Sequence, residues 1–165
     1  MGVVTEAPAS AAALLRRAID AGREGMEAHH GGPFGALVAH PDGTVVGVGC
    51  NRVTSTNDPT AHAEIVAIRA ACAALGTFLL DGCTLYTSCE PCPMCLAAAY
   101  WAHVDAIVYG ATRADAAAAG FDDALIYEEI GRPVDARRIP MRRLADKRAA
   151  ALFQAWRAMT DRTPY

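Results

Sequence analysis

NDPTAHAE at residues 57–64 and LYTSCEPCPMC at residues 85–95 are the two stretches that decide the fold and chemistry of this chain. Together they supply an imidazole (His62), two thiols (Cys92 and Cys95) and a carboxylate (Glu64). Imidazole and thiolate groups bind zinc, and a catalytic zinc site keeps its fourth position for water. The pattern therefore predicts zinc held by His62, Cys92 and Cys95, with Glu64 left free to transfer protons.

Both stretches are predicted to lead into helices. A run that steps by four and three residues predicts a helix that Gly76 ends, with His62 and Glu64 in its first turn; the run is Ala61, Ile65, Ile68, Cys72 and Leu75. A second helix is predicted from Cys92 to Trp101. A helix start favours thiolates, because its free N–H groups and dipole stabilise negative sulfur.

Other cysteines leave a second interpretation of the metal site open. Cys89, or less readily Cys83, could add a fourth ligand and close the site. A closed site is structural rather than catalytic, and it would give Glu64 no role. Cys50 and Cys72 fall in apolar patterns and are expected to be small core residues.

The composition indicates one domain that acts on small molecules. The chain has 165 residues, of which 53% are hydrophobic and 20% charged, which suits a single core. We expect a disordered tail at residues 1–9, a cytoplasmic location and reduced thiols, because no secretion signal or membrane span is apparent. A net charge of −3 argues against a nucleic-acid partner and favours small neutral substrates.

Strand and helix patterns alternate along the rest of the chain. Helices are expected from Ser10 to about His29 and over Ala145–Met159. Strands are expected at Phe34–Ala39, Thr44–Cys50, Cys83–Thr87, Asp105–Gly110 (buried on both faces) and Arg137–Leu144. This order predicts one domain over residues 10–165, a three-layer α/β/α sandwich with a mixed sheet of five strands.

Further stretches carry a family resemblance. H-x-E followed by P-C-x-x-C is the signature of the zinc-dependent nucleobase deaminases. With GGPFGA at 31–36, AGFDDALIYEEI at 119–130 and FQAWR at 153–157, the chain resembles the cytidine deaminase-like superfamily and, within it, the bacterial-type guanine deaminases. The zinc motif is shared by many deaminases, whereas FDD together with FQAWR is more specific to the guanine deaminases.

The resemblance implies hydrolysis of guanine to xanthine and ammonia by a homodimer. By this resemblance Asn51 hydrogen-bonds the purine, Phe34 packs on its ring and Asp123 handles the departing amino group. Residues 145–165 form a C-terminal helix and lid, and Tyr165 closes the pocket across the dimer. Structural interpretations stand beside these: Asn51 could hold its loop, Phe34 could belong to the core and Asp123 could cap a helix.

Several other activities share the same motif. Guanosine, cytosine and adenine deaminases are the near alternatives. A tRNA adenosine deaminase is another, with a basic strip that would bind RNA; the strip is Arg137, Arg138, Arg142 and Arg143. The alternative from a different class is a zinc scaffold without catalysis.

Overall fold

The computed structural model describes residues 10–164 and divides the chain into two compact units, Met1–Tyr127 and Glu128–Tyr165. The first unit contains a four-stranded sheet in the order β2-β1-β3-β4. β1 pairs antiparallel with β2 and β3, and β3 pairs parallel with β4. The strands are β1 (Gly35–Ala39), β2 (Val45–Cys50), β3 (Thr84–Cys89) and β4 (Ala106–Ala111). The predicted α/β class and mixed sheet are therefore confirmed.

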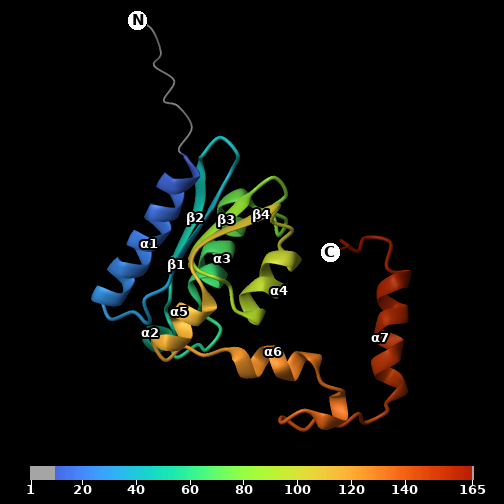
Figure 1. The fold of residues 1–165 in the computed structure, drawn as a ribbon. Coiled ribbons are helices and arrows are strands. Elements are labelled where there is room, and N and C mark those ends of the chain that lie inside the picture. Colours follow the sequence, from blue (N-terminus) through green and yellow to red (C-terminus); the bar gives the residue numbers. More distant parts are fainter. Residues whose placement is uncertain (1–9, 165) are drawn as a thin grey trace, which may run out of the picture. The chain divides into compact units, whose positions relative to one another are not determined.

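Helices cover both faces of this sheet (Figure 1). α1 (Ala11–Glu27) contacts one face, and α3 (Ala63–Leu75) with α4 (Pro93–Trp101) lies on the other. Side chains alternate along β1, so Ala36 and Val38 join the core under α3 while Leu37 and Ala39 join the core under α1. The first unit thus has three layers.

Two glycines of β2 let α3 lie directly on the strand backbone. A Cβ at Gly47 would come within 2.4 Å of the Ala67 carbonyl oxygen, and one at Gly49 within 2.4 Å of the Ala63 carbonyl oxygen. Only glycine allows so close an approach. This packing fixes the first turn of α3, and therefore the position of His62 just before it.

The helix boundaries follow the capping residues that the sequence suggested. The Ser10 side chain accepts a hydrogen bond from the Ala13 N–H at the start of α1, and Gly76, with φ 65°, ends α3. The loop after β2 contains one short helix, α2 (Val53–Thr56). Two helices follow β4: α5 (Arg113–Ala118) and α6 (Ala124–Gly131).

The predicted fifth strand, Arg137–Leu144, is wrong. These residues have no strand pairing in the described part of the chain, whose sheet has four strands. Pro140 lies in the middle of the stretch, where it removes one N–H that a sheet ladder needs. The segment is irregular instead.

The expected burial of the fourth strand on both faces is also wrong. β4 lies at an edge of the sheet, and its Tyr109 is 47% exposed. Its apolar run was typical of a central parallel strand, but β3 is its one neighbour among the described strands.

The second unit contains a short 3₁₀ helix, η1 (Val134–Ala136), and the helix α7 (Lys147–Ala158). Asp146 caps α7 by accepting a hydrogen bond from the Arg148 N–H, so the predicted last helix is confirmed. The apolar pattern of this helix predicts that Leu152 and Phe153 face inward, but both side chains are exposed. Across residues 10–164, no helix combines the length and apolar character that a membrane crossing needs.

Candidate metal centre and active-site pocket

Three residues of the first unit bring metal-binding atoms to one point. The Nδ1 atom of His62 lies 3.5 Å from the Sγ atoms of both Cys92 and Cys95. The three ligand atoms all lie within 4.8 Å of one another. His62 is the N-cap residue of α3, Cys92 is the N-cap residue of α4, and Cys95 lies in the first turn of α4.

These distances match the requirements of zinc. With Zn–S near 2.3 Å and Zn–N near 2.0 Å, a tetrahedral ion separates nitrogen from sulfur by about 3.5 Å. A hydrogen bond from Cys95, assisted by His62, lowers the pKa of the Cys92 thiol to about 4. The same pairing, together with burial, raises the pKa of Cys95. Zinc binds cysteine as the thiolate, so binding at this site would release the thiol protons that remain.

Cys89 does not complete a four-ligand site. Its Sγ atom lies 3.5 Å from the Thr112 carbonyl oxygen, and burial raises the pKa of its thiol. Among the described residues, the one group of His, Cys and acidic side chains able to hold a metal ion is His62, Cys92 and Cys95. The arrangement therefore favours three protein ligands, as in catalytic zinc sites, over a closed structural site.

Glu64 lies beside this centre as a buried carboxylate. It occupies the first turn of α3, is 6% exposed and lines the same pocket as His62. The Thr87 hydroxyl on β3 donates a hydrogen bond to its Oε1 at 3.4 Å. Burial raises the pKa of Glu64 above its ordinary value. A carboxylate with a raised pKa accepts a proton readily near neutral pH, as a general base requires.

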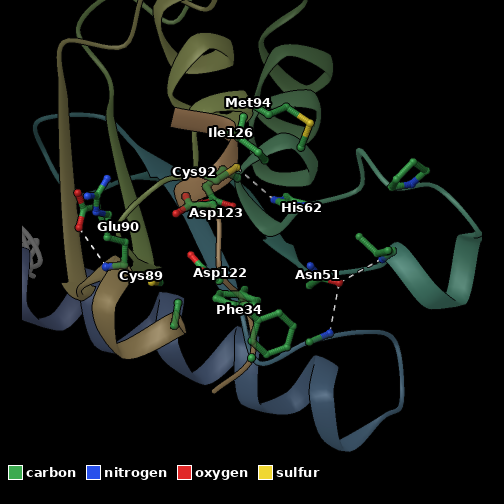
Figure 2. A pocket seen from close by; sticks show the side chains of 18 of the residues that line it. Phe34, Asn51, His62, Cys89, Glu90, Cys92, Met94, Asp122, Asp123 and Ile126 are labelled. Carbon is green, nitrogen blue, oxygen red and sulfur yellow. Dashed lines mark hydrogen bonds between the residues drawn. The ribbon is translucent and has the colours of Figure 1, made fainter. Parts of the chain in front are cut away.

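The pocket in front of the metal centre has a volume of about 470 Å³. Figure 2 shows its lining, in which Cys92 and His62 lie close together and Asp123 points toward Cys92. This volume falls in the range of small-molecule sites. All residues that line it belong to the first unit. They come from the glycine-rich loop before β1, the loop after β2, the beginnings of α3 and α4, the end of β3 with the loop that follows it, and the segment from Arg113 to Ile126.

Asn51 has a fixed orientation in this pocket. Its Oδ1 accepts hydrogen bonds from the backbone N–H groups of Gly32 and Val53, each at 3.2 Å (Figure 2). Because both partners are donors, the amide atom that faces them must be the oxygen, which accepts. The NH₂ group on the other side of the amide is then available to donate a hydrogen bond. The loop-holding role considered for Asn51 is therefore present, and it pre-organises a donor in the wall of the pocket.

Phe34 and Phe121 form an aromatic pair in the same wall. Their ring centroids lie 4.9 Å apart with an interplanar angle of 87°. Such edge-to-face pairs contribute about 0.5–1.5 kcal/mol beyond the area they bury. A Cβ at Gly32 would lie 3.2 Å from both rings, so the glycine leaves room for the pair. The pair presents apolar surface to the pocket.

Asp123 lies immediately before α6, with its side chain in the pocket. Partial burial, and then the negative charge of Cys92, raise the pKa of its carboxyl. The neighbouring Asp122 makes the cap-like contact instead, because its Oδ1 accepts the Ala124 N–H at 2.9 Å. The side chain of Asp123 therefore remains available to a molecule in the pocket.

The structure gathers most of the predicted site residues in one place. Phe34, Asn51, His62, Glu64, Cys92 and Asp123 line the pocket, and Cys95 lies behind Cys92. Tyr165 lies outside the described residues. Sequence reasoning missed Phe121, Arg113 and Glu90 as lining residues. Phe121 stands in the phrase FDD and could have been found there, whereas Arg113 has no local signal.

The chain matches one family model over residues 8–111, that of the cytidine and deoxycytidylate deaminase zinc-binding region. This match covers more than half of the chain and includes all three predicted metal ligands. The chain therefore belongs to the family of zinc-binding cytidine and deoxycytidylate deaminases, which confirms zinc as its cofactor.

Within this family, the chain is most informatively compared with a guanine deaminase of Bacillus subtilis. The two sequences are 51% identical over 92% of this chain and 97% of the relative. The X-ray structure of guanine deaminase from the same organism superposes with a TM-score of 0.92 at 48% identity, covering 95% of this chain and 99% of that one.

Two further relatives are more distant. A structure of guanine deaminase from Nitrosomonas europaea gives a TM-score of 0.68 at 34% identity, covering 79% of this chain and 71% of that one. A tRNA-specific adenosine deaminase of Agrobacterium fabrum is 48% identical over 48% of this chain and 51% of its own length. The similarity to guanine deaminases thus extends over more of the chain.

Proposed function

We propose that this chain hydrolyses guanine to xanthine and ammonia. The observation that carries the proposal is the arrangement of the site: a buried carboxylate, Glu64, opens into the same pocket as the three-residue metal centre, and that pocket offers an amide donor and an aromatic wall. The extensive similarity to the guanine deaminase of Bacillus subtilis supports guanine as the substrate.

The reaction adds water at the ring carbon that bears the amino group and expels ammonia. When bound by His62, Cys92 and Cys95, the zinc ion supplies a water molecule acidified toward neutral pH. Glu64 carries one proton of the attacking water to a ring nitrogen as the carbon–oxygen bond forms. It then carries the second proton from that oxygen to the amino group, which leaves as ammonia when the carbon–nitrogen bond breaks. The buried position of Glu64 keeps its proton from exchanging with solvent during the transfer.

The other pocket residues orient the purine. The Asn51 NH₂ group donates to an acceptor on the ring, while Phe34 packs against the ring. The Asp123 carboxylate accepts an N–H of the amino group as it departs. In Asn51 the loop contacts use Oδ1 and leave the NH₂ group for the substrate. Next to Asp123, Asp122 makes the contact at the start of α6, which leaves the Asp123 carboxylate for the substrate.

The identity of the substrate is tested by one assay. Purified zinc-loaded chain is incubated separately with guanine, guanosine, adenine and cytosine, and ammonia release is measured. We expect release from guanine at a kcat/KM at least about 10²-fold above the other three, because a site that hydrogen-bonds one substrate rejects analogues lacking its partners. A preference for guanosine would reassign the substrate, and no release from any of them would support the scaffold alternative. Release from an adenosine-bearing tRNA stem–loop would support the RNA alternative.

Replacing Asn51 with Ala is expected to raise KM for guanine by about tenfold or more, because the lost amide is a donor to the ring. Steady-state kinetics with guanine measure this effect. Asn51→Asp provides the matched comparison, since it keeps the Oδ1 that holds Gly32 and Val53 but loses the NH₂ group. If Asn51→Asp binds guanine as well as the wild type, the role of Asn51 is confined to the loop.

The C-terminal segment completes the site in a homodimer. Residues 10–165 act as one deaminase domain, in which residues 145–165 supply a helix and a lid that close the pocket of a partner subunit through Tyr165. Four large apolar side chains near the end of the chain are exposed and support this proposal, since exposed apolar surface is available for burial against a partner; they are Leu152, Phe153, Trp156 and Met159. A cytoplasmic location remains a prediction, in keeping with six cysteines that are all free thiols.

Removing residues 163–165 is expected to lower kcat/KM for guanine by about tenfold or more while zinc content stays the same, because a lid excludes water from the reaction. This deletion keeps Arg162, whose guanidinium caps α7 by donating to the carbonyls of Arg157 and Met159. Full activity of the truncated chain would rule out the lid. Mixing it with a Glu64→Gln chain tests closure across the dimer, because only a lid supplied by the partner restores activity.

A further inference from the structure

Three contacts join the segment that carries Asp123 to the loop that carries Cys92. The backbone N–H of Arg113 donates a hydrogen bond to Glu90 Oε2 at 3.0 Å. The guanidinium carbon of Arg113 lies 4.7 Å from the centre of the Tyr127 ring. The Tyr127 hydroxyl donates to the Pro91 carbonyl oxygen at 3.4 Å. Glu90 and Pro91 are the two residues before Cys92, so these contacts end at the metal loop.

Tyr127 and Asp123 belong to the same helical turn. The N–H groups of Ile126 and Tyr127 donate to the Asp123 carbonyl oxygen at 2.9 and 3.4 Å. α6 has only eight residues, and a helix this short depends on contacts with its surroundings for stability. Contacts that hold Tyr127 therefore also determine where the Asp123 side chain lies.

Arg113 is also the main positive charge of the pocket. It is the only Arg or Lys among the described residues that line the cavity, which four carboxylates also line: Glu64, Glu90, Asp122 and Asp123. Burial and the Cys92 thiolate raise the pKa of Asp123, and the charge of Arg113 opposes this rise. A guanidinium over an aromatic face is attracted to the ring, so Tyr127 holds this charge near the acidic wall (Figure 2 shows Glu90, Asp122 and Asp123 of that wall).

We propose that Arg113 is a positioning residue for deamination: stacked on Tyr127, it holds the start of α6 against the metal loop, so that Asp123 meets the departing amino group. The inference rests on the proposed function, since it gives Arg113 an effect only through Asp123. Because that contact forms as ammonia departs, Arg113 acts on kcat more than on KM.

Arg113→Met tests this role, since it removes the charge and the planar group but keeps the backbone N–H that Glu90 accepts. We expect kcat for guanine to fall about 10- to 100-fold, as for a misplaced catalytic group, with KM within about threefold and zinc content unchanged. Arg113→Lys should recover most of the lost activity, because an ammonium also binds an aromatic face. Arg17→Met, an exposed residue of α1, is the matched control and should behave as wild type.

A double-mutant cycle with Asp123→Asn decides whether Arg113 acts through Asp123. In the Asp123→Asn chain, Arg113→Met should change kcat by less than about twofold, because the group it positions is gone. An equal loss in both backgrounds, an unchanged kcat for Arg113→Met, or loss of zinc from that variant would overturn the inference. If Asp123→Asn itself keeps full activity, the proposed function of Asp123 fails, and this is a different outcome from failure of Arg113 alone.

Tyr127→Phe provides a test that does not depend on how well the Arg113 variants fold. It keeps the ring under Arg113 and removes only the hydroxyl that reaches Pro91. We expect kcat to fall about 3- to 10-fold, with no further fall when Asp123 is already Asn. Wild-type kcat in Tyr127→Phe would overturn the link between α6 and the metal loop.

Discussion

Glu64→Gln is expected to lower kcat for guanine by about 10²–10⁴-fold, the contribution typical of a positioned proton-transfer group. The amide has nearly the same shape as the carboxylate and can still accept the Thr87 hydroxyl, but it cannot take a proton from water. Steady-state kinetics give the size of the loss, and metal analysis of the same preparation gives the zinc content. We expect one zinc per chain to be retained.

The control for this variant is Glu27→Gln, which makes the same chemical change at an exposed residue of α1 that does not line the pocket, and it should leave kcat unchanged. Loss of zinc from Glu64→Gln would make Glu64 a metal ligand rather than a proton carrier. Retained activity would remove the general base from the mechanism.

Cys95→Ala is expected to abolish both zinc binding and activity. The variant leaves His62 and Cys92 as the two remaining protein ligands, and two ligands do not hold zinc as three do. Metal analysis after dialysis should show well under one zinc per chain, against one for the wild type. Stoichiometric zinc in Cys95→Ala would contradict the assignment of the metal centre.

Two cysteine variants complete that experiment. Cys72→Ala changes a half-buried thiol that packs against the core, and it should keep its zinc. Cys89→Ala addresses the four-ligand alternative directly, since its sulfur contacts the Thr112 carbonyl rather than the metal group. Loss of zinc from Cys89→Ala, with zinc kept in Cys72→Ala, would show a closed structural site.

The metal centre could be predicted from the sequence because its geometry is local. His62 directly precedes a helix whose apolar spacing is regular, and Cys92 follows the predicted loop at residues 88–91 and directly precedes a second helix, so both positions could be read from the sequence. The sequence does not show that the two helix starts lie together in space. That proximity is inferred because one zinc ion needs ligands from both. The glycines at 47 and 49, which bring α3 onto β2, show how that contact is built.

Features that depend on distant neighbours could not be predicted in the same way. Whether β4 is central or at an edge depends on which strands pair, and its own apolar residues do not reveal this. The stretch around Pro140 has no strand partner in the described chain, and its own residues do not reveal this. Arg113 shares the pocket only because α5 and α6 return to the metal loop, and no spacing in the sequence indicates that return.

Asn51 shows a different limit of prediction from sequence. The sequence suggested two separate interpretations, a ligand-binding amide and a residue that holds a loop. In the structure the two backbone N–H groups that donate to Oδ1 also fix the direction of the NH₂ group, which is the donor that the proposed purine contact uses. Only the coordinates of Gly32 and Val53 could reveal this.

The most direct test of the proposed guanine deamination is to incubate guanine with the purified zinc-loaded chain in water labelled with heavy oxygen and to measure the products. Hydrolytic deamination forms a carbon–oxygen bond to water and breaks the carbon–nitrogen bond of the amino group. The account predicts one xanthine and one ammonia for each guanine consumed, with one labelled oxygen in the xanthine, and no turnover once the zinc is removed. Guanine that remains unchanged in the presence of the zinc-loaded chain would contradict it.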